Sequence, residues 1–495
     1  AAAINTMALT AAAATSVVVT GNNGLNLTAT GSTAITNFDA SAVIGNSTTA
    51  SANTAATTDS AANLAVTYTS LNATAAGAVT IKGGAGNDTL TGSATATTVD
   101  TITGGAGDDT IQGGRGADVL DGGTNSAAGV DTVTYADVTN ATGHGLANLA
   151  GMAINLSAAE VLQSTIAAAA GGTIVLAGGA GTAGTALAAG TVGYLSTTAA
   201  NSTATMVRDT VTGFEGVVGS ALADYIVGSA TADTIAGGDG ADDILAGAGN
   251  DTIIVASTGQ HDAGETLDGG AGNDTLSITG TTTLITTNAS IANIENIAIS
   301  GTSTVVTTGQ TEDFAITITD TATTLTTGTG SDTITLTAGT GVNTFTPLLT
   351  SGSDTIVGFD VAEDLLDLDT LGAVADTAAG TAVNSVAHIT AGAFTDNSAY
   401  VISDGGLALT ATGVEVITDY TDLTDVAAYL DEGYTSTAAA DEGQFVINDV
   451  AGAKTYVYHF LEGSGGASTI SDAELTLVLT ITEESGAVLT TTEIV

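Results

Sequence analysis

Residues Gly104 to Asp121 read GGAGDDTIQ and then GGRGADVLD, two successive copies of the nine-residue pattern GGxGxDxUx, in which U is a large aliphatic residue. The paired glycines permit a tight turn, because glycine adopts backbone conformations that other residues avoid. The aspartate places a carboxylate inside that turn, and the residues around U can extend into a short strand. The stretch therefore predicts a chain that alternates short strands with carboxylate-bearing turns.

Repeats of this kind are expected to stack. Two nine-residue turns make one flattened revolution of a parallel β-roll, so each turn should lie over the turn two copies away. The U residues Ile111 and Leu120 should then point inward and build a thin core. Calcium takes six to eight oxygen ligands at about 2.3 to 2.6 Å, and stacked turns offer aspartate carboxylates and backbone carbonyls. We therefore expect calcium ions between stacked turns.

The pattern continues on both sides of the opening pair. Pairing of alternate turns predicts ions between Asp88 and Asp109, between Asp100 and Asp118, and between Asp109 and Asp131. The copies that end at Asp100 and Asp131 are stretched by extra residues, yet each keeps its aspartate before an aliphatic position.

Two further blocks follow. In the second block, counting in nines from Gly219 brings four consecutive aspartates to one motif position, and the register returns after an interruption that holds His261: Asp224, Asp233, Asp242, Asp251 and then Asp274, with Glu265 as a weaker candidate ligand. The third block is degenerate, with Asp332, then Asn343 in the carboxylate position, then Asp354. Asparagine keeps an oxygen but loses the charge, so calcium affinity should be lower there.

The candidate calcium ligands are the motif aspartates and glycines of the same turns. They are Asp88, Asp100, Asp109, Asp118, Asp131, Asp224, Asp233, Asp242, Asp251, Asp274, Asp332 and Asp354, with Gly84, Gly86, Gly105, Gly107, Gly114, Gly116, Gly238, Gly240, Gly247, Gly249, Gly270 and Gly272. The alternative for each aspartate is a turn-capping role, in which its side chain bonds only to nearby backbone.

Composition agrees with thin, repetitive β-structure. Of the 495 residues 43% are hydrophobic, but aromatic residues make up only 4% and tryptophan is absent. The net charge of -48 excludes nucleic acid as a partner and disfavours insertion into or binding to anionic membranes, since both partners attract Lys and Arg. It favours divalent cations. A disordered acidic chain is the alternative, but the neutral β-forming residues between the acids argue against it. No cysteine is present, so disulfides do not stabilise the chain.

The pattern divides the chain into six regions of an all-β protein. They are an N-terminal Thr/Ala-rich β-solenoid-like region (1–80), a first calcium β-roll (81–135), an irregular or β insertion (136–212), a second calcium β-roll (213–280), β-segments with the degenerate block (281–371) and a β-rich C-terminal region (372–495). Ser157 and Glu160 are spaced as a capping box and predict a short helix. A second helix is expected over 421–434, and two strands over 454–463 and 474–483.

Catalytic motifs are absent from the sequence. The four histidines, His144, His261, His388 and His459, stand far apart, and neither HExxH nor GxSxG occurs. The neighbouring carboxylates Asp242 and Asp243 are not a glycosidase pair, since the first belongs to a turn and the second to the strand after it. We therefore expect no enzymatic activity.

The nonapeptides, the lead-in GFEGVVGSALAD, the exit SDTIVGFDVAEDLLDLD and the ending TYVYHFLEGSGGASTISDAELTLVLTIT resemble RTX (repeats-in-toxin) proteins, which bacteria export by type I secretion. The resemblance covers 81–135 and 213–276, and more loosely 328–371 and about the last fifty residues. It implies a calcium-loaded parallel β-roll. It also implies an uncleaved C-terminal signal, roughly 454–495, that the type I secretion apparatus recognises.

Among such proteins the chain is most similar to RTX-type surface-layer (S-layer) proteins. This implies a structural protein of the bacterial cell surface that binds roughly ten extracellular calcium ions, folds and assembles into a lattice with copies of itself. The alternatives are an RTX adhesin or an extracellular filament subunit and, less favoured, a calcium-dependent export module of a larger secreted enzyme. A region outside this chain would engage a cell-surface polysaccharide.

Overall fold

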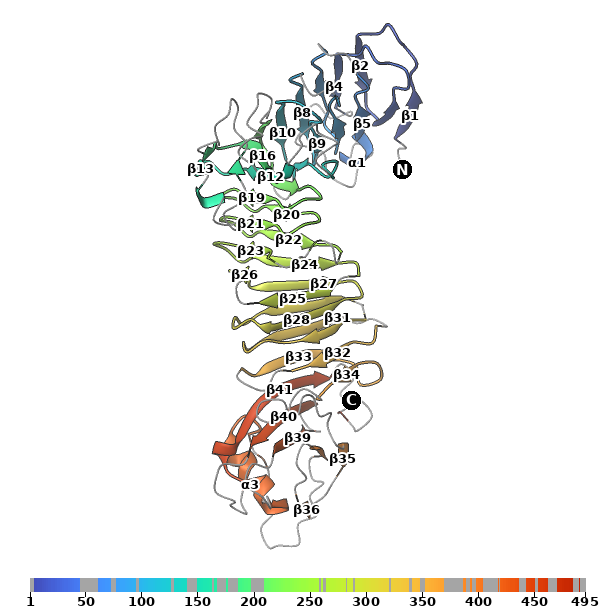
Figure 1. Ribbon diagram of the computed structural model, residues 1–495. Helices are drawn as coiled ribbons and strands as arrows, with labels where there is room; N and C mark the ends of the chain where they lie inside the picture. Colours follow the sequence, from blue (N-terminus) through green and yellow to red (C-terminus); the bar gives the residue numbers. More distant parts are fainter. Residues whose placement is uncertain are drawn as a thin grey trace. The chain divides into compact units, whose positions relative to one another are not determined.

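The computed structural model (Figure 1) describes a defined part of the chain. The described residues are 4–44, 61–72, 77–94, 98–125, 129–139, 149–162, 164–166, 175–176, 186–196, 209–257, 260, 264–281, 283–287, 290–319, 322–337, 341–347, 352–368, 386–388, 392–393, 398–403, 417, 419–435, 442–449, 453–461, 470–483 and 489. Of the sequence predictions, those for His144, His261 and residues 462–469, 484–488 and 490–495 of the expected export signal lie outside this set.

The fold is all-β, and its main body is a parallel β-solenoid, as the repeats predict. The chain divides into two compact units. The first holds Ala1–Val255 and Gly259–Asp274, and the second holds Ala256–Thr258 and Thr275–Val495.

One sheet of the first unit is made of parallel strands throughout. In spatial order its strands are β1 (Asn5–Ala8), β3 (Leu25–Thr28), β5 (Val66–Thr69), β7 (Thr89–Thr91), β9 (Thr110–Gln112), β11 (Thr132–Thr134), β18 (Gly216–Val218), β20 (Thr234–Ala236) and β22 (Thr252–Val255). A short helix, α1 (Ala61–Leu64), precedes β5.

The opposite sheet contains an interruption. Its strands in order are β2 (Ser16–Gly21), β4 (Asn37–Val43), β6 (Thr80–Lys82), β8 (Thr101–Ala106), β10 (Val119–Thr124), β17 (Asp209–Thr212), β16 (Thr191–Ser196), β12 (Leu149–Asn155), β19 (Tyr225–Val227), β21 (Asp243–Leu245) and β23 (Thr266–Asp268). Strand β16 runs antiparallel to both β17 and β12, whereas the other neighbouring pairs are parallel. Among its described residues, the segment between the two repeat blocks (136–212) therefore adds β12, β14 (Val175–Leu176), β16 and β17 to this sheet and no strand to the first.

The predicted helix at Ser157 is wrong. Residues 157–160 are not helical, and the side-chain oxygen of Asn155 accepts hydrogen bonds from the Ser157 N–H (3.0 Å) and hydroxyl (2.6 Å). The chain continues as β13 (Val161–Leu162), which pairs with β15 (Ala186–Leu187), while β14 (Val175–Leu176) pairs with β16. Pairing with a distant strand overrides the local capping signal.

The aliphatic U residues form one stack under each sheet. Register aligns Leu90 with Ile111 and Ile111 with Val133 in one sheet, and Ile102 with Leu120 in the other. All five are completely buried. Stacking of alternate turns is thereby confirmed, and the core is as thin as the repeat predicts.

The second unit continues in the same style. One sheet contains β24 (Thr275–Thr279), β27 (Asn296–Ser300), β29 (Ala315–Thr319), β31 (Thr333–Thr337) and β33 (Asp354–Phe359), all parallel. The other contains β25 (Thr283–Thr287), β28 (Thr304–Gly309), β30 (Thr324–Thr326), β32 (Thr344–Thr346) and β34 (Leu365–Leu366). Strand β26 (Ile291–Ala292) precedes β27, and Figure 1 shows these strands as successive rungs.

The C-terminal part of this unit closes one end of its first sheet. Strand β41 (Leu475–Glu483) lies parallel to β33 and antiparallel to β40 (Lys454–Leu461), which pairs in turn with β39 (Glu442–Asp449). The two predicted strands are thus confirmed. Beyond them lie β37 (Ser398–Ser403) and β35 (Val386–His388), the pair β36 (Gly392–Ala393) and β38 (Tyr434–Thr435), and the 3-10 helix η6 (Asp472–Glu474).

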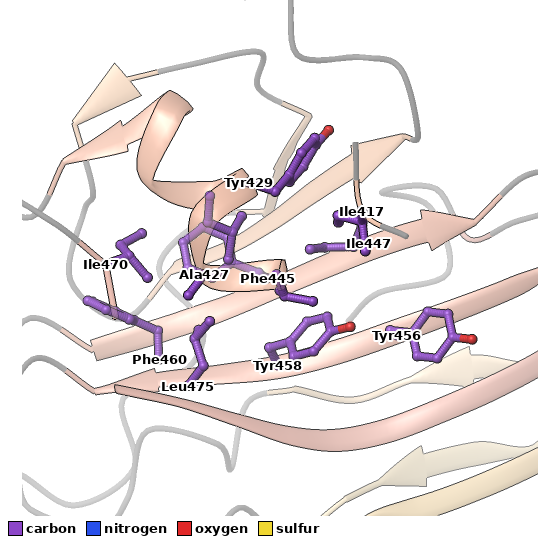
Figure 2. Close-up of a cluster of buried hydrophobic side chains, with 12 residues drawn as sticks. Ile417, Ala427, Tyr429, Phe445, Ile447, Tyr456, Tyr458, Phe460, Ile470 and Leu475 are labelled. Atoms are coloured by element: carbon purple, nitrogen blue, oxygen red, sulfur yellow. The ribbon is translucent and has the colours of Figure 1, made fainter. Parts of the chain in front are cut away.

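The predicted C-terminal helix is α3 (Leu423–Gly433). It packs over the sheet and buries a cluster richer in aromatic residues than the solenoid core (Figure 2). Phe445, Tyr458 and Phe460 contribute to this cluster from the strands, and Val426 and Leu430 from the helix. Within the described residues, no helix has the length and apolar character that a membrane crossing requires.

Candidate metal sites

The motif turns bring successive backbones into close approach. Gly105 has a φ of +123°, and a Cβ added to it would lie 2.2 Å from the carbonyl oxygen of Gly84 in the turn stacked on it. A side chain would both strain the backbone and collide with that oxygen. The glycines of the motif are therefore needed for stacking as well as for turning.

Each motif aspartate is hydrogen-bonded to the aspartate of the turn stacked on it. The backbone N–H of Asp88 donates to Oδ1 of Asp109 over 2.7 Å, and the N–H of Asp109 donates to Oδ1 of Asp131 over 2.7 Å. On the other sheet the N–H of Asp100 donates to Oδ1 of Asp118 over 2.8 Å. The structure thus brings together the three pairs that the spacing predicted, and we call each such row of residues a ladder.

The ladders recur in the later blocks. The donor and acceptor pairs are Asp224 to Asp242 (2.8 Å), Asp233 to Asp251 (2.7 Å), Asp251 to Asp274 (2.8 Å), Asp332 to Asp354 (3.0 Å) and Asn343 to Asp364 (3.0 Å).

The second carboxylate oxygen, Oδ2, lies in a different environment. It is buried and accepts no hydrogen bond in Asp109, Asp118, Asp131, Asp242, Asp251 and Asp332. Each of these residues is at most 1% exposed. A buried ionised oxygen without a partner costs free energy unless a cation or a proton compensates it. These atoms are therefore the places where a bound cation would stabilise the fold most.

A backbone carbonyl converges on the same space. A Cβ placed on Gly104 would lie 2.1 Å from Oδ2 of Asp109 and 2.4 Å from the carbonyl oxygen of Gly122. At Gly122 the corresponding point lies 2.0 Å from the carbonyl oxygen of Gly213 and 2.8 Å from Oδ2 of Asp131. The first glycine of these turns thus borders a space that receives a carboxylate of its own turn and a carbonyl of the stacked turn, and the same holds at Gly83, Gly92, Gly219 and Gly228.

This oxygen set suits calcium. Calcium is a hard cation that takes carboxylate and carbonyl oxygens in flexible numbers. In the described residues no three His, Cys, Asp or Glu side chains gather as a metal cluster, so main-chain oxygens must complete any ligand set. Asp109 and Asp131 would supply carboxylates, and Gly122 a carbonyl. Bound calcium supplies positive charge that offsets the burial of these carboxylates.

Comparison with protein families agrees with this geometry. The model of the RTX calcium-binding nonapeptide repeat matches the chain in four copies, at residues 74–99, 95–126, 218–253 and 262–277. The chain carries RTX calcium-binding repeats. A comparison with curated proteins found no match. Asp131 and the whole third block lie outside the matched residues.

Burial makes the RTX aspartates weak acids while no cation is bound. It raises the pKa of Asp109 to about 8, with the charges of Asp88 and Asp131 adding to the effect. Burial and the charges of Asp224 and Glu265 raise the pKa of Asp242 to about 9. Protons and calcium therefore compete for the same oxygens.

In other RTX turns, Oδ2 already accepts a hydrogen bond. The donors are the N–H of Gly84 to Asp88 (2.5 Å), of Ser93 to Asp100 (2.7 Å), of Ser220 to Asp224 (2.5 Å) and of Ser229 to Asp233 (2.5 Å), and the hydroxyl of Thr327 to Asp354 (2.6 Å). In these turns the aspartate makes the kind of bond expected for a turn-capping role. They also keep the converging carbonyl, since the point beside Gly83 lies 2.0 Å from the Gly104 oxygen and 2.2 Å from Asp88 Oδ2.

The predicted glycine ligands lie one or three positions after the residues whose carbonyls converge. Gly84 and Gly247 accept backbone hydrogen bonds from Ala106 and Ala271 of the stacked turns, both at 2.9 Å. The carbonyls that face Oδ2 belong instead to the first residue of the motif, in Gly104, Gly122, Gly213, Gly237 and Ala246. A repeat pattern marks which residues are glycine, but it does not show which carbonyl points inward.

The ladders also contain acids that the motif did not identify. The N–H of Asp118 donates to Oδ1 of Asp209 over 2.8 Å, and the hydroxyl of Tyr135 donates to Oδ2 of Asp209 over 2.9 Å. Asp364 takes the same place beside Asn343. The sequence offered only a weak sign of Asp209. Like the motif aspartates it directly precedes Thr and an aliphatic residue, but no glycine turn comes before it.

Glu265, the weaker candidate, also stands in a ladder position. The N–H of Thr266 donates to the carbonyl of Asp242 over 2.9 Å, as the N–H of Asp243 does to Asp224 over 2.8 Å. Glu265 is 4% exposed, so its carboxylate belongs to the buried row.

Proposed function

We propose that this RTX protein is a structural surface-layer protein of the bacterial cell surface, which folds on binding extracellular calcium and assembles into a lattice. The observation that carries the folding step is the row of buried Oδ2 atoms without a hydrogen-bond partner, of which those of Asp109 and Asp131 face a carbonyl of the stacked turn. Such rows are unfavourable without cations and favourable with them.

Calcium would then act as a folding switch. Free calcium inside cells is far below the roughly 0.1 to 1 mM at which extracellular calcium modules bind, so the clustered carboxylates would repel and keep the chain unfolded for export. Outside, millimolar calcium would fill the sites and stabilise the folded state by mass action. The type I secretion apparatus would engage the C-terminal segment from Lys454 onward.

Assembly is supported by the acids that the ladders do not use. The chain has 52 acidic and four basic residues. Asp108, Asp239 and Asp313 are exposed beside motif turns or ladder strands. Carboxylates on the surface of a protein with so few basic side chains would attract divalent cations, and such cations could bridge neighbouring copies. No catalytic role is part of this proposal.

Two measurements on the purified chain test the proposal. Circular dichroism should show β-structure gained with millimolar calcium and lost with chelator, and an unchanged spectrum would refute the folding switch. Electron microscopy of the calcium-loaded sample should show sheets. Filaments would favour a filament subunit, and persistent monomers would favour an adhesin or an export module of a larger secreted enzyme.

A further inference from the structure

The two RTX blocks meet directly on one sheet of the first unit. Strand β11 ends the first block and pairs in parallel with β18, with Val133 opposite Val217. Val133 is completely buried and Val217 is 1% exposed, so the aliphatic stack is unbroken at the junction. On this sheet the segment between the blocks therefore leaves the stacking of turns intact.

Glu215 occupies the motif-aspartate position of the turn that follows the junction. A regular backbone hydrogen bond marks this position. The carbonyl of the residue at the motif-aspartate position accepts the N–H of the residue that follows the same position in the stacked turn. Thr132 donates to Asp109 (2.7 Å), Gly216 to Asp131 (2.8 Å), and Thr234 to Glu215 (2.7 Å). The ladder thus runs from Asp109 and Asp131 through Glu215 to the second block.

The side chain of Glu215 also makes the ladder contact. Its Oε2 accepts the N–H of Asp131 over 3.2 Å, as Asp131 accepts the N–H of Asp109. The side-chain amide of Asn125 donates to the same oxygen. The amide oxygen of Asn125 is buried and accepts no hydrogen bond.

The remaining oxygens of the junction converge on Gly122. Oδ2 of Asp131 is buried without a partner, and Asp131 itself is 0% exposed. This atom lies 2.8 Å, and the carbonyl oxygen of Gly213 2.0 Å, from the point where a Cβ of Gly122 would stand. Gly213 has a φ of +66°, a left-handed conformation that glycine adopts without strain.

We propose that Asp131, Gly213 and Glu215 form a junction calcium site that joins the two RTX blocks. Asn125 would position the Glu215 carboxylate and could add its amide oxygen. The matched repeats end at residue 126 and resume at residue 218, so this site lies between them. It makes the two blocks one continuous calcium array on this sheet. It depends on calcium binding by the chain and not on lattice assembly.

Hydrogen exchange with calcium titration tests the junction site. Glu215→Gln keeps an oxygen that can accept the Asp131 N–H but removes the charge. In chelator, the variant and the parent chain should exchange alike at residues 129–135 and 213–218. In calcium, protection of these residues in the variant should require about tenfold more calcium, a typical effect of disturbing a metal site. The variant should also bind one calcium ion fewer in equilibrium dialysis.

Glu160→Gln is the matched control, because Glu160 is exposed and lies in the segment between the blocks. It should behave as the parent chain does. An unchanged calcium midpoint in Glu215→Gln would overturn the site, and a difference already present in chelator would assign Glu215 a hydrogen-bonding role only. The two proposals can fail separately. Sheets seen by microscopy without a junction site would overturn only this inference, and a junction site without sheets would overturn only the lattice assembly.

Discussion

Replacing Asp109 with alanine should disable two calcium sites at once. The Asp109 carboxylate faces both neighbours in its ladder, since Oδ1 accepts the N–H of Asp88 while Oδ2 converges with the carbonyl of Gly122. A site at one hundred times its Kd contributes about 2.7 kcal/mol, so two such sites contribute roughly 5 kcal/mol. We expect the variant to lose two bound ions and about that much free energy of unfolding in saturating calcium.

The assay is equilibrium dialysis for ion count, together with urea unfolding in saturating calcium. Asp108→Ala is the control, because Asp108 is the exposed neighbour in the same turn. The Asp108→Ala variant should keep the ion count of the parent chain to within one ion. Loss of a single ion in Asp109→Ala would show that each turn serves one site, and the stacking account of the ligands would be refuted.

Three further predictions concern pH, backbone and charge. Burial raises the pKa of Asp131 from 3.8 to about 7, so its contribution to folding without calcium is complete below 3.8 and is lost as pH rises through 7. Circular dichroism in chelator should therefore show more β-structure at pH 5 than at pH 8, and calcium binding should release protons. Gly105→Ala should destabilise more than Gly264→Ala in thermal unfolding, because both glycines have φ above +100° but only Gly105 would place its Cβ against a carbonyl, and equal losses would contradict this. Asn343→Asp should lower stability in chelator and raise it in calcium, because it sets a second carboxylate beside Asp364, and calcium-independent loss would exclude a site there.

The stacking of turns was predictable because it depends on spacing alone. Nine-residue periodicity placed Ile102 over Leu120 and Asp233 over Asp251 without any knowledge of the surrounding chain. Degenerate turns such as the one ending at Asp131 also fell into place, since the residue before the strand fixes the register and the turn can lengthen.

The acids outside the motif were not predictable in the same way. Asp209 and Glu215 join ladders whose previous members, Asp118 and Asp131, precede them by a long segment. Sequence spacing carries no information across such a segment, because the return of the chain depends on strand pairing. The antiparallel strand β16 was missed for the same reason, and Ser157 shows that a local helix signal can lose to such pairing.

Calcium located directly in the turns tests the central claim most simply. We expect crystals grown in millimolar calcium to give anomalous difference peaks between stacked turns, within about 2.3 to 2.6 Å of Oδ2 of Asp109 and the carbonyl of Gly122. Turns that stay stacked in saturating calcium with no peak beside those oxygens would contradict the account, because the buried carboxylates would then be held by protons or water alone.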